Sequence, residues 1–394
     1  MQELRDGRIK PRVKVPCIFR GVMAMLWARV GSLNALEQIK DSPFLRKWIG
    51  ADKIGSADTQ GAVFCTIDCP QIRDLIRDVH TQLMRNKALR GMFQGMRALI
   101  VDGHEQTNSY KKECTGCSKR RIQTEKGEVL QNYHRHVTAM LVTGKRHLLL
   151  DFELQRPGED EVACATRLLE RIFKSYARAF DVVLGDGLYA QGKFFKMAQE
   201  HGKEVIAVLK DDRRDLMKDA MGIFERSAPQ VIQDKKVHRQ VWDMENFTSW
   251  EGFGKEVRVV RSLETRKIKR QKDNKGKKDK KEEILIADWV WVTTLPKWKA
   301  NTATIIWLGH ERWAIENHGF NELSTYWHAN HIYKHDPHAI EAFWLAMLLA
   351  YDLFHAFIDL NLKPQIRVGR SIQYWAKLIA AELYAQEGCL PSGP

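Results

Sequence analysis

Two aspartates in this chain of 394 residues each follow a short apolar run and precede a glycine. Asp102 follows residues 97–101 and Asp186 follows residues 181–185, and both patterns predict a buried strand that ends in a tight turn. Carboxylates at the carboxyl ends of neighbouring strands point into the crevice where α/β folds bind ligands. Two such groups repel each other unless a cation bridges them, and Mg²⁺ prefers oxygen ligands. The alternative is that each Asp-Gly pair only closes a turn.

A third carboxylate, Glu316, lies in the stretch 312–317, Arg-Trp-Ala-Ile-Glu-Asn. Within the helix predicted over residues 302–321, Arg312 and Glu316 are four residues apart and share one face. Trp313 and Ile315 lie off that face, where they can anchor the helix on a sheet. Taken alone, this pair is equally typical of an ion pair on a helix surface, which contributes little to stability.

The elements that must position these side chains follow from the periodicity of the apolar residues. Residues 15–95 predict short helices. Strands are predicted at 97–101, 137–142, 147–154, 181–185 and 204–209, with helices at 159–179 and 191–201 between them. This order predicts a fold of the α/β (α+β) class, in which helices flank a mixed sheet. Alternation with a period of two between residues 231 and 295 predicts a β-rich insertion, and helices at 302–321, 337–360 and 372–385 follow it.

The chain resembles the DDE transposases of bacterial insertion sequences, in the insertion-sequence-four superfamily, over about residues 95–360. The resemblance rests on three stretches in chain order: Asp102-Gly, Asp186-Gly-Leu-Tyr189 and Arg312-Trp-x-Ile-Glu316-Asn317-x-Gly-Phe320-Asn321-x-Leu323. It implies a ribonuclease H-like catalytic domain in which Asp102, Asp186 and Glu316 form the catalytic triad and hold Mg²⁺. It also implies that Arg312 is the signature arginine and contacts DNA.

The resemblance further implies an activity: Mg²⁺-dependent DNA cleavage and strand transfer at insertion-sequence ends, with Mn²⁺ able to substitute. Two metal ions would stabilise the attacking and the leaving oxygen, with Asp102 bridging both. The implied partners are element ends, target DNA and further copies of the chain, as a homodimer or higher multimer in the bacterial cytoplasm at the nucleoid. Two alternatives remain open: a catalytically silent, transposon-derived DNA-binding protein, and a ribonuclease H-like nuclease without strand transfer.

Two positions depart from the family signature. Gly309 stands where the resemblance places a tyrosine, and Leu323 or Ser324 stands where it places a lysine. The resemblance implies that those two side chains contact DNA phosphates, so DNA positioning here must depend on other groups.

The composition changes along the chain predict five parts. These are a helical N-terminal domain (1–95) that is a candidate for DNA binding, the first part of the catalytic core (96–227), the β-rich insertion (228–300), the second part of the core with the glutamate helix (301–364), and a C-terminal helix and tail (365–394).

Basic residues are concentrated in one stretch of the insertion. The net charge is +14, and residues 266–281 hold ten Lys or Arg against two Asp. A basic excess favours a polyanionic partner, because each neutralised phosphate releases counterions. We expect an exposed loop that contacts DNA phosphates, through Lys277, Lys278, Lys280 and Lys281. Trp298, between two lysines, is a candidate for base stacking, whereas Trp289 and Trp291 share a strand face and are expected to fill the core of the insertion.

Cys114 and Cys117 have a CxxC spacing, and His134 and His136 follow them. Two thiolates and two imidazoles can hold a structural Zn²⁺ ion, but the spacing of the histidines is unusually short, and free thiols are the alternative. His331 and His335 also have a metal-ligand spacing, although polar contacts are favoured there. The odd cysteine count and the absence of a signal peptide favour reducing cytoplasm. The longest apolar run, 343–351, is too short to span a membrane.

Overall fold

A mixed sheet of ten strands forms the centre of the computed structural model, which describes residues 1–91, 93–125, 127–144, 146–210, 214–234, 237–274 and 277–385, with backbone alone for 93 and 269–282. The strands are β1 (Ala98–Ser109), β2 (Ser118–Thr124), β3 (Gly127–Thr143), β4 (Arg146–Leu154), β5 (Val182–Gly185), β6 (Glu204–Val208), β7 (Gln230–Asp234), β8 (Val237–Phe247), β9 (Val257–Asn274) and β10 (Lys277–Thr293). Their order is β2-β3-β1-β5-β6-β10-β9-β8-β7, with β4 paired to β3. The pairs β1–β5 and β5–β6 are parallel, and their neighbours β3 and β10 run antiparallel to them.

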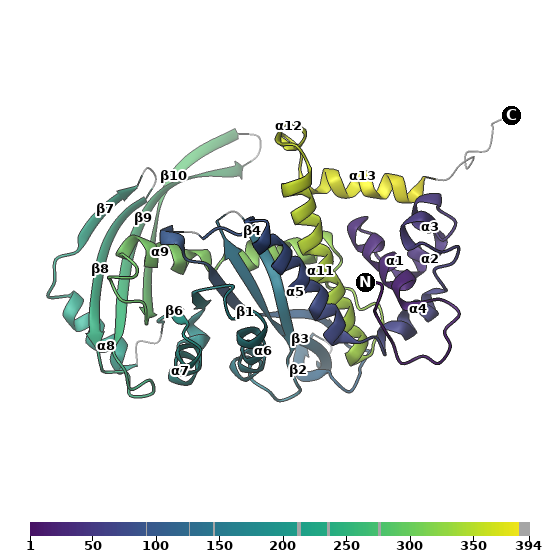
Figure 1. Cartoon of the computed structure of the whole chain (residues 1–394). Helices are drawn as coiled ribbons and strands as arrows, with labels where there is room; N and C mark the ends of the chain where they lie inside the picture. Colours follow the sequence, from purple (N-terminus) through teal and green to yellow (C-terminus); the bar gives the residue numbers. More distant parts are fainter. Residues whose placement is uncertain are drawn as a thin grey trace.

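Helices cover both faces of the sheet and form a separate group at its end. The N-terminal helices are α1 (Val15–Trp27), α2 (Leu33–Gln38), α3 (Pro43–Ile49), α4 (Ala57–Phe64) and α5 (Cys69–Arg85). The core adds α6 (Glu161–Ser175), α7 (Gly192–Glu200) and α8 (Asp215–Phe224), and the C-terminal part adds α9 (Thr302–Glu311), α10 (Asn321–Tyr326), α11 (Pro337–Asn361), α12 (Pro364–Arg367) and α13 (Ile372–Tyr384). Helices α1–α4 and strands β7–β10 lie at opposite ends of the molecule (Figure 1). This arrangement confirms the predicted mixed sheet with flanking helices, consistent with a ribonuclease H-like fold.

Alternation along β1 decides which side chains meet which helices. Leu99 and Val101 pack with the apolar faces of α6 and α7, whereas Ala98 and Ile100 pack in the cluster that contains α11. Because successive side chains on a strand point to opposite faces, Asp102 shares the face of Ile100. The acidic side chain is therefore directed to the side of the sheet that the C-terminal helices cover.

The insertion is built from strands, as its period-two pattern predicts, but the expectation of a Lys-rich loop was wrong. Residues 257–274 and 277–293 pair in register as the long antiparallel hairpin β9–β10, so most of the basic stretch belongs to two strands. The neighbouring strand β8 pairs with β9 only as far as Arg266. The distal part of the hairpin thus continues beyond the rest of the sheet (Figure 1).

Helix α11 contains the longest apolar run of the sequence. Among the described residues it is the one helix long and apolar enough to cross a membrane by length and composition, yet 67% of its most apolar window is buried inside the structure. It contacts α5, β4 and α1, as the central helix of a folded core does. The division of the chain into five parts stays a prediction. Strand β10 of the predicted insertion pairs directly with β6 of the predicted core, so one sheet continues across the boundary between these two parts.

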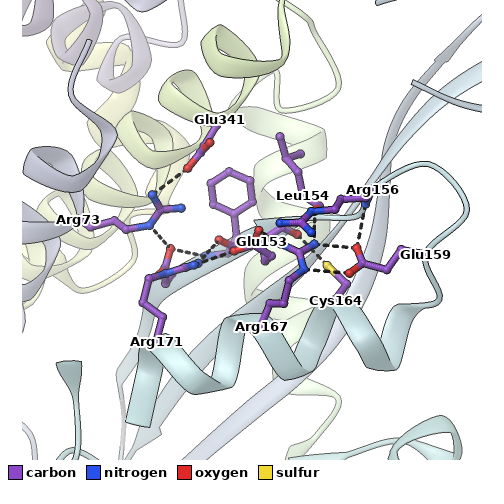
Figure 2. A network of polar contacts seen from close by, with 11 residues as sticks. Arg73, Glu153, Leu154, Arg156, Glu159, Cys164, Arg167, Arg171 and Glu341 are labelled. Carbon is purple, nitrogen blue, oxygen red and sulfur yellow. Dashed lines mark hydrogen bonds and ion pairs between the residues drawn. The ribbon is translucent and has the colours of Figure 1, made fainter. Parts of the chain in front are cut away.

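A network of arginines and carboxylates holds α6 against β4 and links both to α5 and α11. Figure 2 shows this network, in which Arg167 contacts Glu153 and Glu159, Arg171 contacts Asp151 and Glu153, and Arg73 contacts Asp151 and Glu341. Asp151 is 2% exposed and lies 3.0 Å from Arg73 and 2.5 Å from Arg171. The network fixes α6 against β4, and the first residue of this helix, Glu161, lies beside the site described below.

We expect Asp151→Ala to destabilise the protein by about 3–5 kcal/mol, because two partly buried guanidinium groups lose their shared partner. Urea unfolding measures the change in the free energy of unfolding. Asp74→Ala on α5 is the matched control: Asp74 is exposed and pairs only with Arg77 in the described structure, so its loss should change stability by less than about 0.5 kcal/mol. Equal effects of the two substitutions would contradict a structural role for the network.

Candidate active site

Asp102 lies in the interior of β1 and not at its end. The strand runs on to Ser109, and Asp102 pairs with Thr138 of β3. The prediction of a turn at Asp102-Gly103 was therefore wrong. The glycine serves another purpose, because a Cβ at Gly103 would lie 2.2 Å from a carboxylate oxygen of Glu161. Gly103 thus lets the first residue of α6 approach the strand beside Asp102.

Asp186 follows β5 directly, as the sequence predicts. Its Oδ1 accepts a hydrogen bond of 2.8 Å from the backbone N–H of Leu188 and so caps the short 3₁₀ helix Gly187–Tyr189. Ile100 of β1 pairs in parallel with Leu184 of β5, and two further steps along this register bring Asp102 beside Asp186. Because side chains alternate between the two faces of a strand, both aspartates are expected to point to the same face of the sheet.

Glu316 does not lie in the continuous helix that its spacing predicts. Helix α9 ends at Glu311, and Ile315–Phe320 form a π-helical turn that contains Glu316. π-helical turns are rare and are frequent at functional sites. The turn packs tightly on the sheet, since a Cβ at Gly319 would lie 2.8 Å from Met140. Of the two residues predicted to anchor the helix on the sheet, Ile315 is fully buried and is confirmed as an anchor. Trp313 is 40% exposed and is not.

Arg312 joins two of the acidic side chains. Its Nη1 lies 3.3 Å from Asp102 Oδ2 and 3.4 Å from Glu316 Oε1, and the residue is only 6% exposed. The predicted contact between Arg312 and Glu316 is therefore present, together with a second contact to the sheet. In the described part of the chain, the ligand atoms of Asp102, Asp186 and Glu316 are not gathered within 4.8 Å of one another. The guanidinium group supplies the positive charge that holds Glu316 close to Asp102.

Several carboxyl groups lie close together at this site, and they affect the pKa of Asp102. Burial raises the pKa of Asp102 to about 7; Arg312 opposes this shift, whereas Asp186, Glu161 and Glu316 add to it. A carboxyl group with this pKa is easily deprotonated by a bound cation. The oxygen donors and their mutual repulsion fit a hard divalent ion such as Mg²⁺.

The sequence analysis missed Glu161, the fourth acidic side chain at this site. Glu161 begins α6, where the positive end of the helix dipole favours a carboxylate. Its Oε1 accepts a 2.9 Å hydrogen bond from the hydroxyl of Tyr189, and its Oε2 lies 3.9 Å from Arg135. No sequence signal distinguished it from other acids in first turns of helices. The Asp-Gly-Leu-Tyr stretch, however, supplies its hydrogen-bond donor.

The two departures from the family signature have different structural settings. A Cβ at Gly309 would lie 2.4 Å from the indole of Trp291, so a tyrosine has no room there. Leu323 is fully buried and Ser324 contacts Asn330, so neither position offers a cation. Lys210 follows β6, and its Cδ lies 3.3 Å from the position that a Cβ would take at Gly187, so the aliphatic part of this side chain packs on the turn after Asp186.

Of the residues predicted to contact DNA, Arg312 lies in the acidic cluster and is only 6% exposed. Trp298 is 81% exposed, which suits a stacking platform, while Trp291 is fully buried and stacks on Trp289 with ring centroids 6.0 Å apart. The core-filling prediction is thus confirmed for Trp291, whereas Trp289 is only partly buried. The side chains of four predicted phosphate ligands lie outside the described residues: Lys277, Lys278, Lys280 and Lys281.

A second group of metal-binding side chains lies apart from the acids, and its membership corrects the sequence prediction. Cys114, Cys117 and His134 lie together with His335, their ligand atoms within 4.8 Å of one another. His136 is not a member. It points into an aromatic environment, with its ring centroid 4.3 Å from Trp344 and 5.7 Å from Phe152.

Comparison with known families bears on the acidic site. The family model described as "Transposase DDE domain" matches residues 94–353, which is most of the chain and includes all three predicted catalytic acids. No curated protein gives a significant match to the chain.

Proposed function

The chain belongs to the transposase DDE-domain family, and we propose that it cleaves DNA at insertion-sequence ends and joins the freed strand to target DNA. The observation that most directly supports this proposal is the position of Arg312. Its guanidinium group contacts both Asp102 and Glu316, on the sheet face that Asp186 shares. DNA is the substrate class of the family. We further propose membership of the insertion-sequence-four superfamily, on the three stretches that carry the resemblance.

Asp102, Asp186 and Glu316 would hold Mg²⁺, with Mn²⁺ as a substitute. When bound, Mg²⁺ polarises the phosphodiester and lowers the pKa of the attacking water or DNA hydroxyl. Arg312 would orient Asp102 and Glu316, and Glu161 would add negative charge beside Asp102. No side chain needs to act as a nucleophile, so one site can serve both cleavage and transfer. The protein would act as a homodimer or higher multimer on DNA, in the bacterial cytoplasm at the nucleoid.

The test uses the full chain with DNA duplexes that carry the element ends, and with the same ends already cut. The expected result is cleavage of the first and joining of the second to target DNA, in the presence of Mg²⁺ or Mn²⁺ and not of EDTA. Cleavage without joining would identify a nuclease that does not transfer strands. DNA binding without either reaction would identify a catalytically silent DNA-binding protein. Both of these outcomes contradict the proposal.

The basic end of the β9–β10 hairpin is proposed to contact DNA phosphates. Replacing residues 266–281 with a short neutral turn should weaken DNA binding and flatten its salt dependence, since each lost phosphate contact lowers the slope of log K against log salt by about 0.9. Fluorescence anisotropy at several salt concentrations measures this slope. Trp298→Ala is the comparison: loss of stacking should weaken binding to single-stranded DNA with little change in slope. An unchanged slope in the shortened protein would contradict the role of the hairpin.

A further inference from the structure

Four side chains from three separate segments converge at the end of the sheet where β1, β2 and β3 meet. Cys114 and Cys117 come from the turn between β1 and β2, His134 from β3, and His335 from the segment between α10 and α11. Cys117 and His134 are buried, and the other two side chains are half-buried. The group is independent of the acidic site and of the function proposed for it.

The donor atoms have the spacing of a tetrahedral site. The two Sγ atoms are 3.6 Å apart; His134 Nε2 lies 3.4 Å from Cys114 Sγ and 3.2 Å from Cys117 Sγ, and His335 Nε2 lies 3.6 Å from Cys117 Sγ. Zinc bond lengths of about 2.3 Å to sulfur and about 2.0–2.1 Å to nitrogen place tetrahedral ligands about 3.8 Å (S to S) and about 3.6 Å (S to N) apart. The observed separations agree with these values to a few tenths of an ångström.

The same distances argue against a disulfide. A disulfide needs an S–S separation of about 2.05 Å, and both thiols are free in the structure. Soft sulfur and imidazole nitrogen in a four-ligand set are the donors that select zinc among the common divalent ions.

Hydrogen bonds and close packing hold the turn that carries the cysteines. The N–H of Cys117 donates to Cys114 O at 3.1 Å, and the N–H of Cys114 is directed at Cys117 Sγ at 3.2 Å. A Cβ at Gly116 would lie 3.2 Å from Pro337, the first residue of α11, so the turn packs closely on that helix. Asn132 Nδ2 donates to Lys112 O at 3.2 Å and ties the approach to the turn to β3.

We propose that Cys114, Cys117, His134 and His335 bind a structural Zn²⁺ ion that fastens the segment after the Glu316 turn to the catalytic sheet. Segment 327–336 contains no regular helix or strand and joins α10 to α11. A metal bond to His335 would replace the backbone pairing that this segment lacks. Metal affinity would then contribute directly to the folding of this part of the chain.

Metal content of the purified full chain tests the proposal. One zinc per chain is expected in the wild-type protein and in Asp186→Ala, which separates this site from the acidic one. His335→Ala should weaken zinc binding by roughly 100-fold or more, since loss even of an outer-shell partner costs about 10–100-fold. His331→Ala is the matched control, because His331 lies in the same segment and contacts Tyr333, outside the group. It should keep the metal.

Replacement of the zinc by Co²⁺ gives a second readout that does not depend on activity. The visible bands of a tetrahedral cobalt site and the sulfur-to-cobalt charge-transfer band are expected in the wild type. His335→Cys should retain the metal and strengthen the charge-transfer band, which guards against a variant that fails only because it misfolds. Removal of zinc by a chelator should lower the melting temperature and open segment 327–336 to proteolysis.

Three results would overturn the proposal. These are a metal-free wild-type protein whose two thiols react at once with a thiol reagent, a Cys114–Cys117 disulfide in the mass spectrum of protein purified without oxidant, and an undiminished zinc affinity in His335→Ala. The first would establish free thiols, the second a redox pair, and the third a site without His335.

Discussion

Replacing Asp186 with alanine is expected to lower Mg²⁺-dependent DNA cleavage by roughly 10³-fold or more, while DNA affinity stays within a few-fold of the wild type. A metal-bound transition state gains several kcal/mol from the ion, and each 1.36 kcal/mol is worth about a factor of ten in rate. Asp102 and Asp186 each lie two residues beyond the last pair of β1 and β5, and Asp186 is close enough to raise the pKa of Asp102, so its loss removes one of the proposed ligands. Single-turnover cleavage at saturating Mg²⁺ measures the effect. Asp102→Ala and Glu316→Ala should behave alike.

Glu311→Gln is the matched control for these three variants. Glu311 ends α9 close to the site in sequence, but its carboxylate faces His147 at 3.7 Å and not the acidic cluster. Its substitution should leave the cleavage rate within a few-fold of the wild type. Thermal unfolding shows whether each variant is folded. Substantial Mg²⁺-dependent cleavage by a folded Asp186→Ala protein would end the assignment of the triad.

Mg²⁺ binding is expected to strengthen as the pH rises to about 7 and then to level off. Without metal, burial raises the pKa of Asp102 to about 7 from an ordinary value of 3.8, with the neighbouring acids adding to the shift and Arg312 opposing it. Below pH 7 an incoming cation must displace a proton, so the apparent affinity should fall up to tenfold per pH unit. Calorimetric titration between pH 5.5 and 8.5, in buffers of different ionisation enthalpy, measures both affinity and proton release.

The same shift has a defined effect on the stability of the metal-free protein. Between pH 3.8 and about 7 the folded state binds a proton at Asp102 that the unfolded state has released. The bound proton therefore stabilises the folded state fully below pH 3.8, the ordinary pKa, and this stabilisation is lost as the pH rises through the folded-state pKa of about 7. The loss is on the order of 4 kcal/mol. Asp102→Asn removes the titrating group, and the difference between the two proteins isolates it. A pH-independent difference, together with a pH-independent Mg²⁺ affinity, would contradict the raised pKa.

The main elements of the fold could be predicted because they depend on local patterns. Strand β5 and residues 205–208 of β6 are continuous apolar runs buried on both faces, and α11 begins at Pro337 with Asp336 as its cap. The end of β1 was misjudged because an Asp-Gly pair is a strong turn signal. Glycine was needed there for the approach of Glu161, and such a contact between distant segments leaves no mark in the local sequence.

The candidate site was predictable to the extent that its residues lie in recognisable stretches. Asp186 and the pairing of Arg312 with Glu316 follow from spacing, whereas the π-helical turn has no period that distinguishes it from an α-helix. His335 could not be assigned to the cysteines, because its segment returns to the sheet only after the Glu316 turn and α10. His134 and His136 share a strand face, but they stand two residues apart, and only the first is reached by the cysteine turn.

The pairing of Trp291–Thr293 with Val208–Ile206 makes the insertion inseparable from the core. A shortened protein without residues 230–295 would leave β6 with an open edge, a ready template for strand-to-strand association between molecules. It would also empty the space beside Gly309 that the indole of Trp291 fills. The length and charge of the far end of the β9–β10 hairpin can therefore change without affecting the core. The last residues of β10, 291–293, must stay, because they pair with β6.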